Sequence, residues 1–441
     1  MAVLGATTLQ LRADYPIASH RYLADPSSLV TKDRVYLYCS NDDESPVGGS
    51  YNIPNVICVS SSDMKNWTDH GSVFRAADST TWAKKTWAPA AIERAGKFFL
   101  YFGNGGANIG VAVAPSPVGP FTEPLGQALL THNTPGVQPA KNMWLFDPGA
   151  FIDDDGQAYL YFGGNGDNNV RAVKLNRDMI SLEGEVMKLN ATNFFEAAWV
   201  FKRQGVYYFS YSTTPRAQMR IDYLTSNNPT NGFTYRGVVA NQPPLNSNDN
   251  NHSAQFEFQG RWYHVYHNRI VAKEAGIPTG FRRNLGFEEF SFNDDGAIKK
   301  VTYTTNGVAQ LGQLNPYVRV EGETFNAQSG VETEPCSEGG LNLTELNQGD
   351  WVRIVGVDFA KGGKKFSARV ASTAQGGGIE LRLGGLDGKL IGTCKVENTG
   401  GPQTWKAATC EVSGAAGVQD LYLKFTGSAG SQFNLDYWKC E

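Results

Sequence analysis

The sequence lacks long apolar runs and clusters of positive charge. A helix needs roughly 18 or more consecutive apolar residues to span a bilayer. No stretch of the 441 residues approaches that length, so no membrane association is expected. Charged residues make up only 19% and the net charge is −4, which argues against nucleic acid as a partner. Helical periodicity is weak over residues 12–305, which disfavours a helical architecture.

Cysteine is scarce and has no metal-ligand spacing. Four of the six cysteines lie beyond residue 335, and none forms a C-x-x-C motif. The first ten residues, MAVLGATTLQ, lack the charged and apolar segments of a signal peptide. An even cysteine count and four N-glycosylation motifs nevertheless favour a secreted protein whose signal peptide has been removed. A cytosolic protein with free thiols is the alternative. The motifs begin at Asn66, Asn190, Asn251 and Asn342.

Aromatic residues and glycine are abundant instead. Aromatics reach 12% and glycine counts 49, which together predict many short strands joined by tight turns. A surface rich in aromatic rings suits neutral ligands that stack on them. The chain is too long for one ordinary core, so we expect two domains.

One pattern, a polar turn followed by an aromatic-rich strand, occurs five times at intervals of about 50 to 65 residues. This period admits four strands per repeat and predicts the blades of a propeller rather than a helical solenoid. Five blades would fill residues 12–305. The copies are KDRVYLYCSND from Lys32, GKFFLYFGN from Gly96, DGQAYLYFGGN from Asp155, QGVYYFSYSTT from Gln204 and QGRWYHVYHNR from Gln259.

Equivalent positions in the five repeats carry acids and a histidine. Counting back 11 or 12 residues from an aromatic of each strand gives Asp25, Ala88, Asp147, Glu196 and His252. In a propeller, such positions on the innermost strands point toward one mouth of the central channel. The three carboxylates and the histidine are therefore expected to converge.

Each of these residues also has an ordinary explanation when it is taken alone. Asp25 and Asp147 precede prolines and could merely start turns. Glu196 lies inside the apolar strand FFEAAWVF, where a carboxylate needs a partner. His252 could be a core histidine or a ligand for an ion on the axis. Three acids in register across three blades are harder to attribute to chance.

Converging carboxylates beside aromatic residues suit glycoside hydrolysis. That reaction needs one protonated acid for the leaving oxygen and one ionised carboxylate. A third carboxylate would raise the pKa of the acid by like-charge repulsion. The same acids could instead bind calcium, as in a non-catalytic lectin.

Four segments resemble the blade motifs of glycoside hydrolase family 43: YLADPS, WAPAAIERAGKFFLYFGN, WLFDPGAFIDDDGQAYLYFGG and FFEAAWVFKRQGVYYFSYST. The resemblance covers residues 12–305 and implies an inverting glycosidase on a five-bladed β-propeller. By motif, it implies that Asp25 is the general base, Asp147 the pKa modulator and Glu196 the general acid.

The same resemblance implies further site residues. Arg283 in FRRNLGFEEF matches an arginine that contacts the active-site carboxylates, although Asn284 stands where the family usually has serine. His252 matches an axial histidine that lies near a bound ion or its waters. Four aromatic residues are candidate pocket walls and substrate contacts: Trp82, Trp87, Trp144 and Phe146.

Within the family, the chain is most similar to arabinoxylan arabinofuranohydrolases and β-xylosidases. The resemblance implies an exo-acting enzyme that releases α-L-arabinofuranosyl residues from arabinoxylan or arabino-xylo-oligosaccharides. β-Xylosidase activity, alone or together with the first, is the alternative, because the two sugars present similar hydroxyl patterns. We expect a monomer.

Residues 306–318 are a predicted linker, and residues 319–441 alternate apolar and polar positions as in a β-sandwich. This segment resembles carbohydrate-binding module family 6, through VEGETFNAQSG and FNLDYW. The resemblance implies a structural calcium ion held by Glu321, Glu323 and Asp436. Cys394 and Cys410 flank a predicted hairpin and are expected to pair, which leaves Cys336 to pair with Cys440.

The sugar cleft of such modules usually has two aromatic rings, and this sequence lacks both. Glu345 and Pro402 stand at those positions, while Asn434, the usual polar contact, remains. Trp405 is expected to pack in the core. The module is therefore expected to brace the propeller rather than bind glycan.

Overall fold

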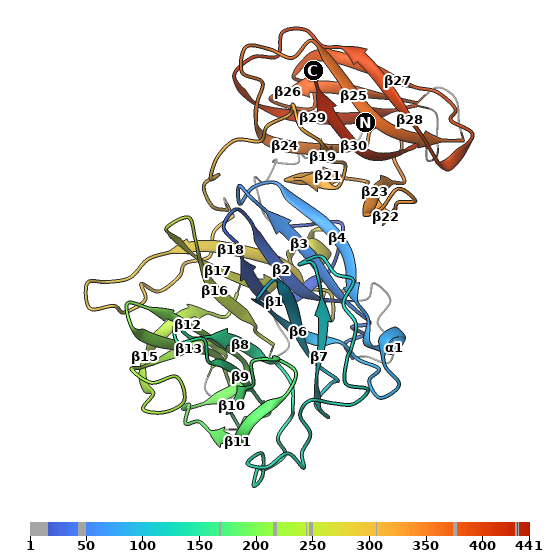
Figure 1. Cartoon of the computed structure of the whole chain (residues 1–441). Helices are drawn as coiled ribbons and strands as arrows, with labels where there is room; N and C mark the ends of the chain where they lie inside the picture. The colour runs from blue at the N-terminus through green and yellow to red at the C-terminus, as the bar shows by residue number, and fades with distance from the viewer. Residues whose placement is uncertain are drawn as a thin grey trace, which may run out of the picture.

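The computed structural model shows two all-β bodies joined in sequence (Figure 1). Only two short helices occur among the residues it describes, α1 (Ala76–Ser79) and α2 (Ile270–Glu274). No helix in that part of the chain is long and apolar enough to cross a membrane. The described residues are 16–42, 50–166, 169–214, 218–243, 245–246, 250–305, 307–373, 377–427, 430 and 432–441.

The N-terminal body consists of five antiparallel sheets, each built from consecutive strands. Three sheets contain four of these strands, as the repeat length predicts, whereas the second and fifth contain only three. The strands are β1 (Leu23–Val30), β2 (Val35–Asn41), β3 (Val56–Ser61), β4 (Trp67–Phe74); β5 (Trp87–Arg94), β6 (Lys97–Gly103), β7 (Ile109–Ala114); β8 (Gly149–Ile152), β9 (Ala158–Phe162), β10 (Arg171–Leu175), β11 (Leu182–Lys188); β12 (Phe194–Arg203), β13 (Val206–Thr213), β14 (Arg220–Ser226), β15 (Thr234–Asn241); β16 (Ser253–Phe258), β17 (Arg261–Asn268) and β18 (Asn284–Phe290).

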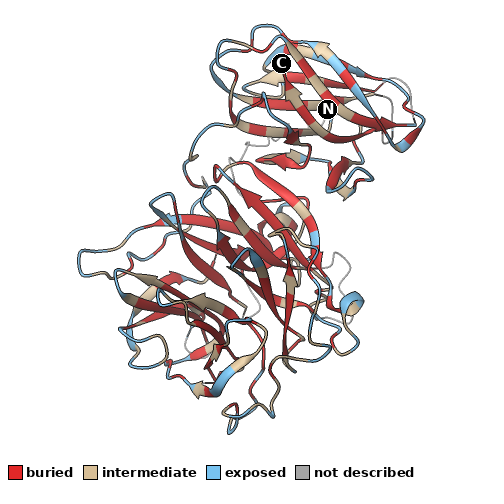
Figure 2. Ribbon diagram, in the orientation of Figure 1, coloured by how far each residue is buried: buried red, intermediate tan, exposed pale blue. Residues whose placement is uncertain are grey.

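The first strands of the five sheets contact one another in cyclic order, β1 to β5, β8, β12, β16 and back to β1. Small residues permit this approach, since a Cβ atom at Gly149 would collide with the backbone oxygen of Ala198. Aromatic rings fill the space between sheets, as where Phe201 of the fourth sheet contacts Trp262 of the fifth with centroids 5.0 Å apart. Most of the strand residues are accordingly buried (Figure 2).

The C-terminal body is a sandwich of two sheets. One has the strand order β22-β23-β30-β25-β28, with β19 also paired to β30, and the other has β21-β24-β29-β26-β27. The strands are β19 (Val320–Glu321), β21 (Ala327–Ser329), β22 (Glu332–Pro335), β23 (Leu341–Thr344), β24 (Trp351–Asp358), β25 (Lys365–Ser372), β26 (Gly377–Leu383), β27 (Lys389–Val396), β28 (Gly401–Glu411), β29 (Val418–Thr426) and β30 (Asn434–Cys440).

The predicted disulfides are half right. Cys394 and Cys410 are bonded and link β27 to β28, as expected. Cys336 and Cys440 are free, so the second predicted pair is wrong. Cys336 packs beside Trp405 and lies against Asp436 of β30, whereas Cys440 ends that strand. Four residues of extended strand span about 13 Å, beyond the reach of a disulfide.

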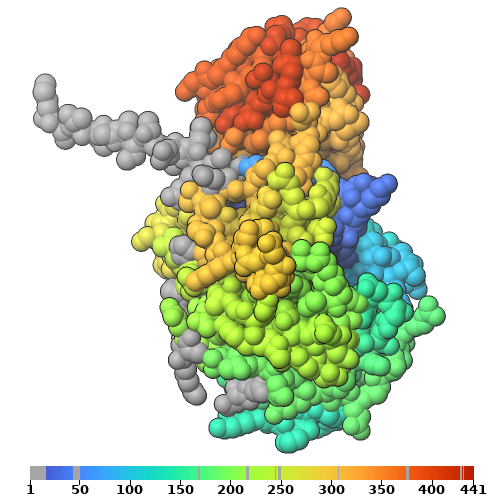
Figure 3. Space-filling view, turned by 90° about the vertical axis from the view of Figure 1, so that its left-hand side faces the viewer, coloured from blue at the N-terminus to red at the C-terminus, as the bar shows by residue number. Residues whose placement is uncertain are grey.

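The two bodies share a sheet and pack directly on each other (Figures 1 and 3). Strand β20 (Thr324–Phe325), from the C-terminal region, pairs with β4 and becomes the outermost strand of the first sheet. The Asn66 side chain donates to the backbone oxygen of Val355 at 2.8 Å and accepts from its N–H, also at 2.8 Å. The interface is therefore built from backbone pairing as well as side chains.

The glycosylation motifs are mostly inaccessible. Asn66, Asn251 and Asn342 are 3%, 0% and 0% exposed, so in the folded chain they cannot accept a glycan. Only Asn190 among the four is exposed. The motifs therefore give less support for secretion than the sequence suggests.

Candidate active site

A pocket of about 420 Å³ lies where the first strands of the five sheets meet. Its lining includes the predicted aromatic walls Trp87, Trp144 and Phe146. Trp82 is not part of it: its ring stacks on Phe102 with centroids 5.8 Å apart, and its Nε1 donates to Glu123. The full lining is Asp25, Tyr51, Ile53, Trp87, Ala88, Gly106, Trp144, Phe146, Asp147, Phe195, Glu196, Asn250 and Arg283.

A repeated backbone kink places the pocket residues. Asp25, Ala88 and Asp147 have φ angles of 48°, 42° and 48°. The pairing of β1 with β2 and of β5 with β6 shifts register at the corresponding points. A bulge of this kind re-aims a side chain. A left-handed conformation is strained for residues other than glycine, and such strain concentrates at functional sites.

Glu196 departs from this register by one residue. The left-handed position in the fourth sheet belongs to Ala197, with φ 61°, and Glu196 comes immediately before it. Counting back 11 or 12 residues from the aromatic residue of each repeat placed Glu196 itself at the equivalent position. The shift lets the bulged peptide contact the neighbouring acid: the Ala197 N–H donates to Asp147 Oδ2 at 3.0 Å.

Asp25 is the carboxylate paired with a cation. Its Oδ1 lies 2.6 Å from Arg283 Nη1. Its backbone N–H donates to His267 Nδ1 at 3.2 Å, which ties the kink to the fifth sheet. The side chain is almost fully buried. A buried carboxylate needs such a partner, because an unpaired charge is costly to bury.

The pKa values of the other two acids are both raised. Burial raises the pKa of Asp147 well above its usual value, and the charge of Asp25 raises it further. Burial also raises the pKa of Glu196, and the charges of Asp147 and Asp25 add to the effect. Negative charge on its two neighbours therefore favours a proton on Glu196, and a protonated acid beside carboxylates is the division that acid–base catalysis requires.

His252 lies between the acids, as predicted, but makes no hydrogen bond to them. Its Nδ1 is 3.8 Å from Asp25 Oδ1 and 3.6 Å from Asp147 Oδ2. Burial lowers the pKa of His252 to about 4, so the ring is neutral near pH 7. Within the described part of the chain, no group of three or more His, Cys, Asp or Glu residues is arranged to hold a metal ion.

Sequence reasoning missed several residues of the site. Asp42 binds Arg283 from the side opposite Asp25, and Tyr51 lies under the guanidinium, 4.3 Å from ring centroid to Cζ. Asn250 accepts from Arg283 Nη1 at 3.0 Å. No repeat or motif marked them, because they lie on connections between strands. Asn284, the departure from the family pattern, donates from its amide to Asn268 and leaves Arg283 correctly placed.

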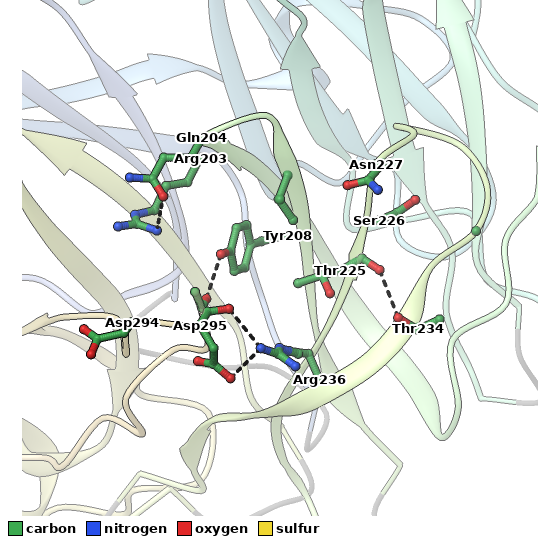
Figure 4. Close-up of a pocket in the computed structure, with 13 residues that line it drawn as sticks. Arg203, Gln204, Tyr208, Thr225, Ser226, Asn227, Thr234, Arg236, Asp294 and Asp295 are labelled. Atoms are coloured by element: carbon green, nitrogen blue, oxygen red, sulfur yellow. Dashed lines mark hydrogen bonds and ion pairs between the residues drawn. The ribbon is translucent and has the colours of Figure 1, made fainter.

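A second hollow, of about 470 Å³, lies on the fourth sheet (Figure 4). Its carboxylates are Asp294 and Asp295, and Asp295 is paired with Arg236 at 2.7 Å. Both are exposed, so neither is shielded from water as Asp25, Asp147 and Glu196 are. The pocket of the three buried acids is therefore the candidate active site.

The C-terminal acids lie close to one arginine. Arg319 Nη2 is 2.8 Å from Glu321 and 3.2 Å from Asp436. Glu323 Oε2 and Asp436 Oδ2 are buried without a hydrogen-bond partner. Burial raises the pKa of both Glu323 and Asp436. Two buried carboxyl oxygens without partners are the chemistry that a hard cation accepts.

At the position of the expected sugar cleft in the C-terminal body, the amide of Asn434 is used within the protein. Both described contacts of Asn434 Nδ2 are internal, to Glu334 at 2.6 Å and to the backbone oxygen of Pro402 at 2.9 Å. Trp405 is buried, as predicted, and its Nε1 donates to Ser337. Glu345 is exposed and offers no ring for stacking.

An aromatic-walled pocket that holds an arginine-bound carboxylate beside two acids with raised pKa values defines a glycosidase type of site. The comparisons with known proteins agree. Residues 13–298 match the family model of glycosyl hydrolases family 43, and residues 321–441 match that of carbohydrate binding module family 6. The chain belongs to glycosyl hydrolases family 43, a family of inverting glycoside hydrolases.

Named relatives span the whole chain. An arabinoxylan arabinofuranohydrolase of Paenibacillus polymyxa is 40% identical over 96% of this chain and 74% of its own length. A solved structure of a family 43 arabinoxylan arabinofuranohydrolase from Bacillus subtilis, in complex with cellotetraose, is 39% identical, covers 98% of both chains and has a TM-score of 0.91. Xylosidase/arabinosidase 43A of Humicola insolens is 32% identical over 64% of this chain and 98% of its own.

Proposed function

We propose that the chain is an exo-acting α-L-arabinofuranosidase that releases arabinofuranosyl residues from arabinoxylan or arabino-xylo-oligosaccharides with inversion. The observation that carries this is the pocket, in which Asp25, paired with Arg283, lies beside Asp147 and Glu196, whose pKa values are raised. Its volume of about 420 Å³ suits a single sugar unit rather than a long chain segment. The two arabinofuranohydrolases that align with nearly the whole chain support the choice of sugar. We also propose that the five sheets are the blades of one five-bladed propeller.

Each carboxyl group has one task in this mechanism. Asp25 takes a proton from the water that attacks the anomeric carbon, and Glu196 gives its proton to the leaving oxygen. The charge of Asp147 raises the pKa of Glu196. An inverting enzyme needs base and acid about 6.5–9.5 Å apart to admit the water. Arg283 keeps Asp25 oriented through the 2.6 Å contact.

The aromatic residues divide between the sugar and the polymer. Phe146 is almost fully buried and Trp87 is partly buried, so they border the bound sugar. Trp144 is 40% exposed and meets Phe146 and Phe195 edge to face at the rim. An exposed ring at that place is suited to stack on a sugar of the main chain.

Two aryl glycosides test the proposal directly. Turnover of an aryl α-L-arabinofuranoside and of an aryl β-D-xyloside should be measured side by side, with proton NMR of the first-formed product. Faster arabinofuranoside hydrolysis with inverted configuration is expected. Turnover of the xyloside alone would make the chain a β-xylosidase, one of the two activities in the Humicola insolens relative's name. Retained configuration would contradict the mechanism.

A calcium ion in the C-terminal body is a further proposal. Glu321, Glu323 and Asp436 would hold it, and the two carboxyl oxygens without partners support this. Arg319, whose side chain is 47% exposed, can move aside from Glu321 and Asp436. Its chemistry there would be structural, tying the first strand of the module to the last. We also propose that an ion or its waters can lie beside His252 on the axis.

We propose that the protein acts as a secreted monomer. A polymeric substrate must be met outside the cell, which supports secretion. The shared sheet and the interface hydrogen bonds suggest that the C-terminal module braces the catalytic body. Its internal use of Asn434 argues against glycan binding at that cleft.

A further inference from the structure

Asp42 is a buried carboxylate that none of the steps above uses. It directly follows β2 and is 2% exposed. Its Oδ1 accepts from Arg283 Nη2 at 2.7 Å, and its Oδ2 accepts from Nε at 2.8 Å and from the Arg283 backbone N–H at 3.0 Å. A single carboxylate thus fixes both the backbone and the guanidinium of the arginine. The backbone N–H of Asp42 is itself fixed by Tyr22.

This grip leaves one edge of the guanidinium for the pocket. With Nε and Nη2 occupied by Asp42, Nη1 remains to reach Asp25 at 2.6 Å and Asn250 at 3.0 Å. The ring of Tyr51 supports one face of the group. A planar fork held on its far edge by two parallel bonds has little rotational freedom. The orientation of Asp25 therefore depends on Asp42, which does not line the pocket.

Asp42 also balances charge. Arg283 is 1% exposed and carries a full positive charge beside three acids. That charge already lowers the pKa of Glu196 against the larger raising effects of burial and Asp147. Without Asp42, the charge would act on the pocket with less compensation, and the acid would lose its proton at lower pH.

We propose that Asp42 is a positioning residue, which holds Arg283 so that Asp25 stays aimed at the attacking water and Glu196 keeps its proton. The proposal rests on the functions proposed for Asp25 and Glu196. Titratable and charged groups face this unit from the first, third, fourth and fifth sheets and from the connections near them. They are Asp25, Tyr51, Asp147, Glu196, His252, His267 and Arg269.

The test is the pH dependence of kcat for Asp42→Asn. Asparagine keeps the shape but cannot accept two parallel bonds, so kcat should fall about 10²-fold while KM changes little, as for a misaligned catalytic group. The alkaline limb, which reports the acid in the bound complex, should move to lower pH. Asp42→Glu keeps the charge with altered geometry, so its kcat should fall about tenfold at an unchanged alkaline limb.

A matched control is Glu288→Gln. Glu288 is also a buried carboxylate, bonded to Thr304 and Tyr266 and without a described contact to Arg283. The Glu288→Gln substitution should lower thermal stability and leave the acid and alkaline limbs of the kcat–pH profile at their wild-type positions.

Each failure is distinguishable. The proposal is wrong if Asp42→Asn folds and its kcat–pH profile has the wild-type limbs. It is also wrong if the alkaline limb moves to higher pH. If that variant does not fold, Asp42→Glu decides: wild-type kcat would overturn the proposal. If the wild-type chain hydrolyses only the xyloside, the proposed substrate is refuted. The pH profiles of kcat would then be recorded with the xyloside.

Discussion

Each body contains a set of three acids in which burial raises pKa values, but the roles proposed for the two sets differ. The pocket carboxylates are Asp25, Asp147 and Glu196, and the C-terminal carboxylates are Glu321, Glu323 and Asp436. Burial raises the pKa of two members of each set. Each set also contains an arginine contact, from Arg283 or Arg319.

The surroundings of the two arginines differ. Arg283 is 1% exposed and gripped by Asp42, next to a cavity of about 420 Å³. The side chain of Arg319 is 47% exposed, so this arginine is far less constrained than Arg283. A carboxyl group with a raised pKa can therefore serve catalysis or structure. Access of a substrate and a rigid counter-charge decide which.

The strongest test of this difference is to remove one proton donor from each set. Glu196→Gln should lower turnover of arabinoxylan by about 10²–10⁴-fold, since general acid catalysis contributes that much. An aryl glycoside with a good leaving group should suffer less, because it needs less protonation. The matched variant Glu323→Gln should retain kcat. Initial rates on both substrates suffice, and near-normal arabinoxylan turnover by Glu196→Gln would exclude it as the acid.

Calcium should stabilise the C-terminal body and leave the rate of the reaction in the pocket unchanged. Glu323 and Asp436 have raised pKa values in the folded chain, so their contribution to stability is present at low pH and is lost as pH rises through those values. A cation would offset the loss at neutral pH. At 100 times its Kd, calcium should add about 2.7 kcal/mol, seen as a rise in Tm that chelator reverses. An equal rise at pH 4, or in Glu323→Gln, would contradict the site.

The interface between the bodies can be weakened at one residue. Asn66→Ala removes both hydrogen bonds to Val355 and takes away the described partner of its N–H, whereas its carbonyl still accepts from Gln310 at 3.0 Å. The free energy of unfolding should fall by about 2 kcal/mol, measured by urea denaturation. Asn133→Ala, at an exposed asparagine, is the control and should change it by less than about 0.5 kcal/mol. Equal effects would show that the bodies are energetically independent.

Acid should destabilise the catalytic body through its buried histidines. Burial lowers the pKa of His252 to about 4 and of His264 to about 3. A lowered pKa in the folded chain gives stability that is present above the unfolded value, near 6.5, and is lost as pH falls toward the folded values. Tm should therefore decline between pH 6.5 and 4. His264→Gln should decline less, and an identical decline would exclude that residue as a cause.

The smallest effect is expected at the former sugar cleft. Asn434→Ala should leave retention of the inactive Glu196→Gln chain on xylan unchanged in an affinity gel, because its amide is already used internally. Trp144→Ala in the same background should weaken retention by losing a stacking ring. Reversal of these two results would place polymer binding in the C-terminal body.

The sequence predicted the elements that repeat and missed those that do not. Asp25 and Asp147 were found because a strand and its turn recur at a fixed distance. The same logic placed Glu196 one residue out of register, since the bulge at Ala197 changes the count without changing the pattern. Asp42 and Tyr51 lie on connections, where no period applies. The Cys336–Cys440 pair failed because elimination assumes that every cysteine has a partner.

Strand β20 has a consequence for synthesis of the chain. Its partner β4 leaves the ribosome some 250 residues earlier, since Thr68 pairs with Thr324. Until then the outer edge of the first sheet has unsatisfied backbone donors and acceptors, the kind of edge that pairs with other chains. Nascent or truncated forms ending before residue 324 should therefore be the species that aggregate. The first sheet of the N-terminal body is therefore completed only after the start of the C-terminal body has been synthesised.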